Sequence, residues 1–508
     1  MSIESKLRVL RIAPLLIVGL ALHAHGSRAA EPSATTVIIN AQLADGTGAA
    51  LRQANVRIAG DRIERVGSFE PGRDEQVIDA KGLVLAPGFI DIHNHSDKGL
   101  PNDPLAETQI SQGITTAVLG ADGLSPWPLR AWLDERRRNP ASLNIAVMAG
   151  HATLRKAVMG DDYKRVATAA EVERMAQLVG QAMDEGAAGL SSGLEYEVGG
   201  YAATDELVAM ARVAAKRGGF YMTHVRDEAD RSFEALQEEI AIAEQARIPV
   251  DHSHIKLATA KVLGRAQEYI GIIEAARKRG VDFLADCYPY DAWFSTIKVL
   301  VPDKRYEDPV SVQRALDDVG GASRVTIAKF PPNSAYEWHT IDELARKAGI
   351  TPVEMYVRII REGHAGGVDA WVIGHAMVEA DVEAFCRRPW VMVSSDGGLG
   401  LSHPRSAGTF PRVLARYVRE RKVLSLPEAI RKMTSLPAQR LGWSDRGTVR
   451  EGAIADLVLF DAATVTDRAT FAQPTELATG IEKVFVNGTL IWSAGKPTGA
   501  RPGRVLSK

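Results

Sequence analysis

Cysteine is scarce in this sequence, which has only two, Cys287 and Cys386, among 508 residues. A small fold held together by disulfides needs more, so a disulfide framework is excluded. Neither cysteine belongs to a Cys-x-x-Cys pair, and this excludes a structural zinc knuckle. The sequence leaves open whether Cys287 and Cys386 lie close enough to pair.

An excess of charge of either sign is also missing. The formal net charge is -2, and no basic stripe runs along the chain. We therefore expect neither nucleic acid nor an anionic membrane surface as a partner. A Gly-x-x-x-x-Gly-Lys phosphate loop is absent too. With 45% hydrophobic and 24% charged residues, the composition is ordinary for a soluble globular enzyme.

The N-terminus has the pattern of an export signal. Lys6, Arg8 and Arg11 precede an apolar run at Ile12–Leu22, and Ser27-Arg28-Ala29 resembles a cleavage site. The run is too short to span a bilayer comfortably, which disfavours an anchor that stays attached. No later segment is long and apolar enough to span. We expect a signal peptide at 1–29 and a mature protein in the periplasm.

The middle of the chain alternates apolar strands with amphipathic helices, which is typical of parallel βα units. Two helices are clear, Glu171–Glu185 and Asp205–Arg217, the second with Thr204 as its expected N-cap. Eight strands predict a (β/α)8 TIM-like barrel at 87–446. The expected strands are Phe89–His95, Thr115–Gly120, Asn144–His151, Ala187–Leu194, Phe220–Arg226, Val250–Lys256, Val281–Tyr288 and Trp390–Asp396.

Short strands and turns occupy both ends of the mature chain. We expect 30–86 and 447–508 to form one composite small β domain, with a hairpin turn at Asn487-Gly488. Between strands seven and eight, residues 291–367 predict an inserted subdomain with a helix near Ile341–Ala348. Val372–His375 is a further candidate strand, so the count of eight depends on where it lies.

Metal-binding residue types gather where the predicted strands end. His93 and His95 are two positions apart and reach the same side of the first strand. The later strand ends carry Asp122, His151, His224, His254, Lys256, Asp286, Tyr288, Tyr290 and Asp396. In a barrel these ends meet at one rim. Imidazole and carboxylate ligands suit zinc or another divalent metal that activates water, and Asp396 could accept the water's proton. His151 alone fits a buried core histidine equally well.

These strand-end residues resemble the amidohydrolase superfamily. A narrower resemblance, to the N-acyl-D-amino-acid deacylases (D-aminoacylases), covers nearly the whole mature chain. The motifs that carry it are 149–155, Gly189–Tyr196, Thr223–Glu228, Ser253–Lys256, Tyr288-Pro289-Tyr290, Ser395–Gly397, His403-Pro404-Arg405, Gly408–Leu414 and the tail 447–506.

The resemblance implies a site for one or two zinc ions. The family's tightly held zinc uses a strand-two cysteine and the histidines of strands five and six, which implies His224 and His254 here. Asp122 stands at the cysteine position, and a carboxylate can bridge two metals. The alternative is that Asp122 only caps a turn. His93, His95 and Asp396 are then implied as a second, weaker site.

The same resemblance implies the groups that bind substrate. Lys256 is expected to bind the substrate carboxylate. Tyr288 or Tyr290 could join Lys256, and Arg405 is a second candidate for binding an anion. The expected reaction is hydrolysis of the amide bond of N-acyl-D-amino acids, and the D preference follows from the resemblance alone. The alternatives are a dipeptidase, a cyclic amidase, or a non-catalytic exported binding protein that lost its metal through Asp122.

Overall fold

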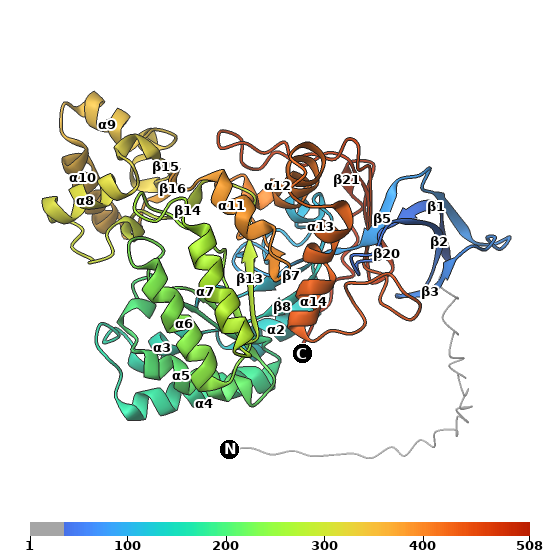
Figure 1. The fold of residues 1–508 in the computed structure, drawn as a ribbon, viewed down its shortest axis with the longest axis horizontal. Helices are drawn as coiled ribbons and strands as arrows, with labels where there is room; N and C mark the ends of the chain where they lie inside the picture. The colour runs from blue at the N-terminus through green and yellow to red at the C-terminus, as the bar shows by residue number, and fades with distance from the viewer. Residues whose placement is uncertain (1–34, 508) are drawn as a thin grey trace, which may run out of the picture. The chain divides into compact units, whose positions relative to one another are not determined.

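The computed structural model describes residues 35–507 (Figure 1). The predicted signal peptide, residues 1–29, lies outside the described residues. No helix among the described residues is long and apolar enough to cross a membrane.

A nine-stranded sheet combines strands from the two ends of the chain. Its order is β21-β20-β19-β18-β5-β1-β2-β3, and β4 pairs with β1. The antiparallel pairing of β5 with β18 joins the two ends, with Leu457 opposite Pro87. Positive φ angles at Asn487 and Gly488 confirm the hairpin turn between β19 and β20. The strands are β1 (Thr36–Leu43), β2 (Arg52–Ala59), β3 (Arg62–Gly67), β4 (Gln76–Asp79), β5 (Val84–Pro87), β18 (Leu457–Phe460), β19 (Ile481–Val486), β20 (Thr489–Ser493) and β21 (Lys496–Pro497).

Two parallel sheets make up a TIM-barrel-like ring. One has the order β6-β7-β8 and the other β17-β13-β12-β11-β10-β9. Only Met148 separates β8 from β9, and a parallel bridge between Asn94 and Gly397 links the ends of β6 and β17. The strands are β6 (Phe89–Asp91), β7 (Ile114–Leu119), β8 (Asn144–Val147), β9 (Ala149–Gly150), β10 (Gly189–Gly193), β11 (Phe220–His224), β12 (Val250–His252), β13 (Phe283–Cys287) and β17 (Val391–Val393). Each of the eight predicted strands overlaps a strand of this ring.

Helices lie between and after the ring strands, as the alternating pattern predicts (Figure 1). In α4, Thr168 and Glu171 form a capping box, and Gly186 ends the helix in a left-handed conformation. The helices are α1 (Glu107–Ile110), α2 (Leu129–Arg138), α3 (His151–Met159), α4 (Ala169–Glu185), α5 (Thr204–Ala215), α6 (Ser232–Ala246), α7 (Ala266–Lys278), α11 (Glu379–Cys386), α12 (Arg405–Arg412), α13 (Leu426–Met433) and α14 (Ser435–Leu441).

The N-cap prediction for the second helix is wrong by one residue. Thr204 is the first residue of α5, and its N-cap is Ala203, which makes no side-chain capping bond. The Thr204 hydroxyl instead donates to Glu238 at 2.7 Å. A tertiary partner on α6 thus competes with the local capping interaction that the sequence suggested.

A third, antiparallel sheet lies between β13 and β17 in sequence. Its order is β14-β16-β15, and three helices accompany it. The candidate strand at 372–375 is therefore real but pairs outside the ring, and the predicted helix Ile341–Ala348 is confirmed as α9. The elements are β14 (Trp293–Thr296), α8 (Pro309–Asp318), β15 (Val325–Lys329), α9 (Ile341–Ala348), α10 (Pro352–Gly366) and β16 (Trp371–Gly374).

Candidate metal centre

The predicted metal ligands all stand at or just after the carboxyl ends of ring strands. His93 and His95 follow β6, His224 ends β11, and Asp122, His254 and Asp396 follow β7, β12 and β17. Asp122, His254 and Asp396 adopt positive φ angles of 53°, 36° and 45°. Such backbone conformations are unfavourable for non-glycine residues and persist where the surrounding structure enforces them, often at functional sites.

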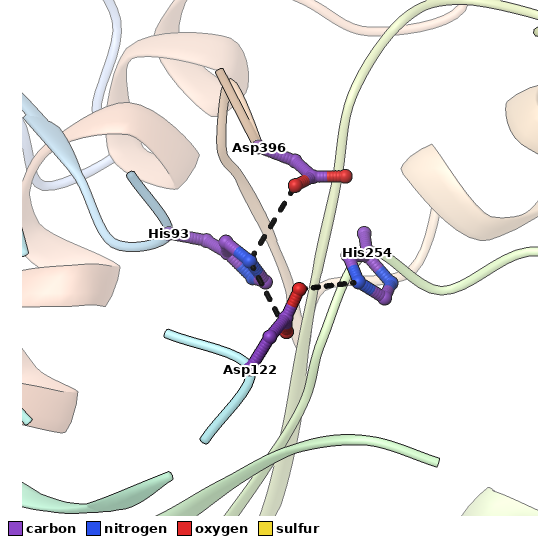
Figure 2. A group of neighbouring side chains, drawn as sticks. All are labelled: His93, Asp122, His254 and Asp396. Atoms are coloured by element: carbon purple, nitrogen blue, oxygen red, sulfur yellow. Dashed lines mark ion pairs between the residues drawn. The ribbon is translucent and has the colours of Figure 1, made fainter. Parts of the chain in front are cut away.

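Four of these side chains converge on one point, as Figure 2 shows for His93, Asp122, His254 and Asp396. His93 Nε2 lies 3.5 Å from Asp122 Oδ1 and 3.5 Å from Asp396 Oδ1. His95 Nε2 joins them, 3.3 Å from His93 Nε2 and 3.2 Å from Asp396 Oδ1. We call His93, His95 and Asp396 the first half of the centre.

His224 and His254 make the second half. His224 Nδ1 lies 3.0 Å from His254 Nε2, and Asp122 Oδ2 lies 3.6 Å from the same His254 nitrogen. Since Asp122 Oδ2 is also 3.5 Å from His95 Nε2, this carboxylate stands between the two halves. A turn-capping role alone would not require that position. The structure therefore brings all six predicted ligands together.

The donor set fits divalent cations. His224 Nδ1 and His254 Nε2 are 3.0 Å apart, and the buried carboxylate of Glu228 groups with both histidines, while Asp122 lies near His254 alone. These ligand types match those of zinc sites. Asp122 Oδ1 is buried and has no hydrogen-bond partner among the described residues. A buried carboxylate oxygen without a partner is costly unless a cation compensates it.

Carboxylates also stand behind three of the histidines, on the nitrogen that faces away from the centre. His224 Nε2 lies 2.8 Å from Glu195 Oε2. His254 Nδ1 lies 2.8 Å from Lys256 Nζ and 3.2 Å from Glu228 Oε1.

His93 has the longest such contact. His93 Nδ1 is 3.5 Å from Asp286 Oδ2, and neither atom has a hydrogen-bond partner among the described residues. A carboxylate in this position fixes which imidazole nitrogen is left free for a metal.

The carboxylates set the charge of the centre. Burial and the Lys256 ammonium act to lower the pKa of His254, but the surrounding carboxylates, Asp396 first, raise it to about 9. Burial acts to raise the pKa of Asp396, but Arg405 and His254 hold it below its usual range. The same balance, with His93 and His254 as partners, holds the pKa of Asp122 well below its usual range. The pocket thus favours ionised carboxylates with positive charge beside them.

The predicted substrate-binding residues lie beside the centre and are paired with carboxylates. Lys256 Nζ donates to Glu228 Oε1 at 2.6 Å. Arg405 Nη1 lies 2.6 Å from Asp396 Oδ2, and the Arg405 guanidinium carbon is 4.9 Å from the centre of the Tyr288 ring. All of these side chains are buried.

Two further candidates, Tyr290 and His151, have their partners outside the metal centre. The Tyr290 hydroxyl donates to the Pro404 carbonyl at 3.3 Å, so of the two tyrosines only Tyr288 contacts Arg405. His151 Nε2 lies 2.8 Å from Glu206, inside a buried network with Arg155. His151 is therefore a core residue that joins α3 to α5.

One stretch of sequence imitates a different active site. Gly189–Gly193 reads Gly-x-Ser-x-Gly, the spacing of a serine-hydrolase elbow. It forms strand β10 rather than a strand-to-helix turn, and the buried Ser191 hydroxyl donates to the Gly120 carbonyl at 2.5 Å. Ser191 has a structural partner and no histidine base, which excludes it as a nucleophile.

Sequence reasoning missed most of the groups behind the histidines. Glu195 lies in the loop after β10, and Glu228 lies in the loop after β11, four residues beyond His224. Tyr196 was missed too, and its hydroxyl is 3.3 Å from His224 Nδ1. Glu195 and Tyr196 follow the end of β10 by two and three residues, and Glu228 follows His224 by four. All three lie within motifs that carry the resemblance, which was the available signal.

Known proteins resemble this chain over most of its length. Residues 76–491 match the sequence profile of the Amidohydrolase family. A D-aminoacylase of Alcaligenes xylosoxydans xylosoxydans is 36% identical over 491 residues, which are 92% of this chain and 96% of the relative. An N-acyl-D-aspartate deacylase of the same organism is 37% identical over 508 residues, with 94% and 96% covered.

Solved structures of related proteins also resemble this fold closely. A D-aminoacylase crystal structure has a TM-score of 0.84 and 36% identity, and the match covers 93% of this chain and 99% of that one. An N-acyl-D-glutamate deacylase from Bordetella bronchiseptica, complexed with zinc and a phosphonate mimic of the tetrahedral intermediate, has a TM-score of 0.84 and 32% identity with the same coverage. Another D-aminoacylase structure is 35% identical, with a TM-score of 0.84 and the same coverage. That enzyme has a binuclear metal centre, in which one metal activates and the second attenuates.

Proposed function

Because this chain belongs to the amidohydrolase family, we propose that it hydrolyses the amide bond of N-acyl-D-amino acids and releases a carboxylate and a free D-amino acid. The observation that carries the proposal is the convergence of His93, Asp122, His254 and Asp396 at the rim of a TIM-barrel-like ring (Figure 2). Deacylases of N-acyl-D-amino acids are among the relatives that match over nearly the whole chain. A small-molecule substrate suits such a buried, polar site.

The two halves of the centre would each hold one divalent ion, with zinc as the proposed metal. The ion of the second half would be held by His224 and His254, and the ion of the first half by His93, His95 and Asp396. Asp122 would contribute to both. When bound, such an ion supplies Lewis acidity, which polarises a carbonyl and lowers the pKa of water.

Asp396 is the proposed general base and acid. It is ionised, buried, and close to the histidine nitrogens of both halves, so it can accept a proton from the attacking water. Returning that proton to the leaving amine completes the hydrolysis, since an amine leaves more readily when protonated. Asp396 Oδ2 faces Arg405 and Asp396 Oδ1 faces the centre, which orients the carboxylate for this transfer.

Lys256, Tyr288 and Arg405 are the proposed substrate-binding residues. Arg405 lies over the Tyr288 ring, and Lys256 is a second buried cation beside the centre. Two such cations suit an α-carboxylate. In this structure Lys256 is paired with Glu228 and Arg405 with Asp396. A substrate carboxylate would therefore compete with Glu228 and Asp396 for these cations. A neutral amide could not replace these carboxylates, so the two cations favour substrates with a carboxylate.

An assay with matched substrates tests the proposed function. The zinc-reconstituted protein is given N-acetyl-D-amino acids, their L enantiomers, dipeptides and hydantoins, and release of the free amino acid is measured. We expect turnover of the D substrates, loss of activity with a chelator, and recovery with zinc. Turnover of only dipeptides or hydantoins, or none after zinc is restored, would overturn the assignment.

We also propose how the chain is divided. Residues 30–86 and 447–508 would form one composite β domain, 87–446 the hydrolase barrel, and 291–367 a subdomain inserted into it. The pairing of β5 with β18 supports the composite domain. The antiparallel β14-β16-β15 sheet supports the insertion.

Export to the periplasm is proposed from the N-terminal sequence. Basic residues, an apolar run and Ser27-Arg28-Ala29 precede the first described strand. N-terminal sequencing of protein released from the periplasm should start near Ala30. A mature chain that starts at Met1 would overturn this localisation.

A further inference from the structure

The only two cysteines of the sequence lie in contact with each other. Cys287 is the last residue of β13 and Cys386 the last residue of α11. Their sulfur atoms are 2.9 Å apart, and each residue is 3% exposed. They are 99 positions apart in sequence, so the contact depends on the tertiary packing of α11 against β13.

We propose that Cys287 and Cys386 form a disulfide bond in the mature protein. A disulfide holds its two sulfurs about 2.05 Å apart, so closure from the observed contact needs a shift of only about 1 Å. Two S–H bonds break and one S–S bond forms. Two electrons and two protons pass to a disulfide-bearing oxidant, which becomes a pair of thiols. The proposed export would place the chain where such oxidants persist.

The bond forms while the chain folds rather than afterwards. Contact with Cys386, and then burial, raise the pKa of the Cys287 thiol well above its usual value. The thiolate is the reactive form, so the folded pair reacts slowly with any oxidant. Before α11 packs on β13, both thiols are accessible to solvent and to the oxidant. Folding then encloses the finished bond.

The cross-link would fix two elements that carry the active site. Cys287 lies between Asp286, which stands behind His93, and Tyr288, which stands under Arg405. Cys386 ends the helix that leads into β17, which Asp396 follows. The bond also closes the segment that holds α8, α9, α10 and the β14-β16-β15 sheet. We therefore expect the bond to stabilise the barrel against unfolding without taking part in the chemistry.

The test is a thiol count on the mature chain, refolded in a glutathione redox buffer or, in parallel, in a reductant. Both samples are denatured, alkylated and weighed, and the peptides are mapped. We expect the oxidised sample to have no free thiol, a mass lower by about 2 Da, and one peptide that joins Cys287 to Cys386. Two alkylated thiols in the oxidised sample, or bonds only between chains, would overturn the proposal.

Thermal unfolding gives a second readout. Because the closed loop is long, the oxidised protein should unfold at a higher temperature than the reduced protein, by up to about 5 °C. The double variant Cys287→Ser, Cys386→Ser is the control, and reductant should leave its Tm unchanged. An equal effect of reductant on the double variant and on the wild type would contradict a stabilising bond. If the double variant does not fold, the thiol count on the wild-type chain still decides the proposal.

Discussion

The two halves of the metal centre differ in how firmly their histidines are held from behind. In the second half, Glu195 Oε2 lies 2.8 Å from His224 Nε2, and Glu228 Oε1 lies 3.2 Å from His254 Nδ1. In the first half, the Asp286 carboxylate is 3.5 Å from His93, and the side chain of His95 is 26% exposed. Histidines whose outer nitrogen is hydrogen-bonded are pre-oriented for a metal. We therefore expect an ion to bind more tightly at His224 and His254 than at His93 and His95.

The two halves are coupled through one side chain. Asp122 places one carboxylate oxygen 3.5 Å from His93 and the other 3.6 Å from His254. A carboxylate is a harder ligand than a thiolate, so we expect it to bind the two ions with more similar strength than a sulfur ligand would. The first two substitutions below remove the proposed base of the first half and the ligand that both halves share. The third removes the carboxylate behind His224, and the fourth removes a proposed substrate-binding cation.

Removing the proton carrier should have the largest effect. Asp396→Asn keeps the shape of the side chain but cannot accept the water's proton, so kcat should fall by about 10³-fold. The ion at His224 and His254 should remain, since Asp396 belongs to the first half. Steady-state kinetics together with elemental analysis checks both statements. Wild-type turnover in this variant would rule out Asp396 as the base.

Removing the shared ligand should weaken both ions. Asp122→Ala deletes the carboxylate that both halves use, and we expect zinc affinity to fall by more than about 100-fold at each, since even outer partners of ligands contribute 10- to 100-fold. Zinc content after dialysis is the measurement. Unchanged zinc content would mean that Asp122 only caps a turn.

Removing the support behind the tight ion should weaken that ion alone. Glu195→Gln replaces the carboxylate at His224 Nε2 with a neutral amide, and zinc affinity should fall by roughly 10- to 100-fold. Glu197→Gln is the matched control, because Glu197 pairs with Lys164 instead. Equal losses in the two variants would show a general effect of charge rather than support for His224.

Lys256→Met should have the smallest effect of the four. Losing one charge-assisted hydrogen bond to the substrate carboxylate should raise KM by about tenfold, with a smaller change in kcat. Lys261→Met is the control, since Lys261 lies in the same loop but pairs with Asp230. If both variants keep the wild-type KM, Lys256 is not a carboxylate-binding residue.

The ring was predictable because its buried strands alternate along the chain with amphipathic helices. Strand lengths were overestimated at the carboxyl ends, as at Val250–His252, because the residues that follow turn into the site. The antiparallel sheet around β16 was not predictable, since an apolar strand does not specify its partner. The predicted N-cap role of Thr204 was wrong for a similar reason, because its hydrogen-bond partner Glu238 is 34 residues away in the sequence.

The site was predictable wherever a functional residue sits at a strand end. All six predicted ligands share this position, and the barrel brings such ends together. Glu195 and Glu228 come from loops, and their contacts depend on loop paths that spacing does not encode. The contact between Cys287 and Cys386 could not be predicted for the same reason, because only the packing of α11 on β13 brings them together.

Calorimetric titration of the metal-stripped mature enzyme with zinc tests the two-half centre most directly. We expect two binding steps per chain, a tight one at His224 and His254 and a weaker one at His93 and His95. Hydrolysis of N-acetyl-D-amino acids should return as zinc is added. A protein that takes up no zinc would contradict the metal centre, and two steps of equal affinity would contradict the difference between its halves.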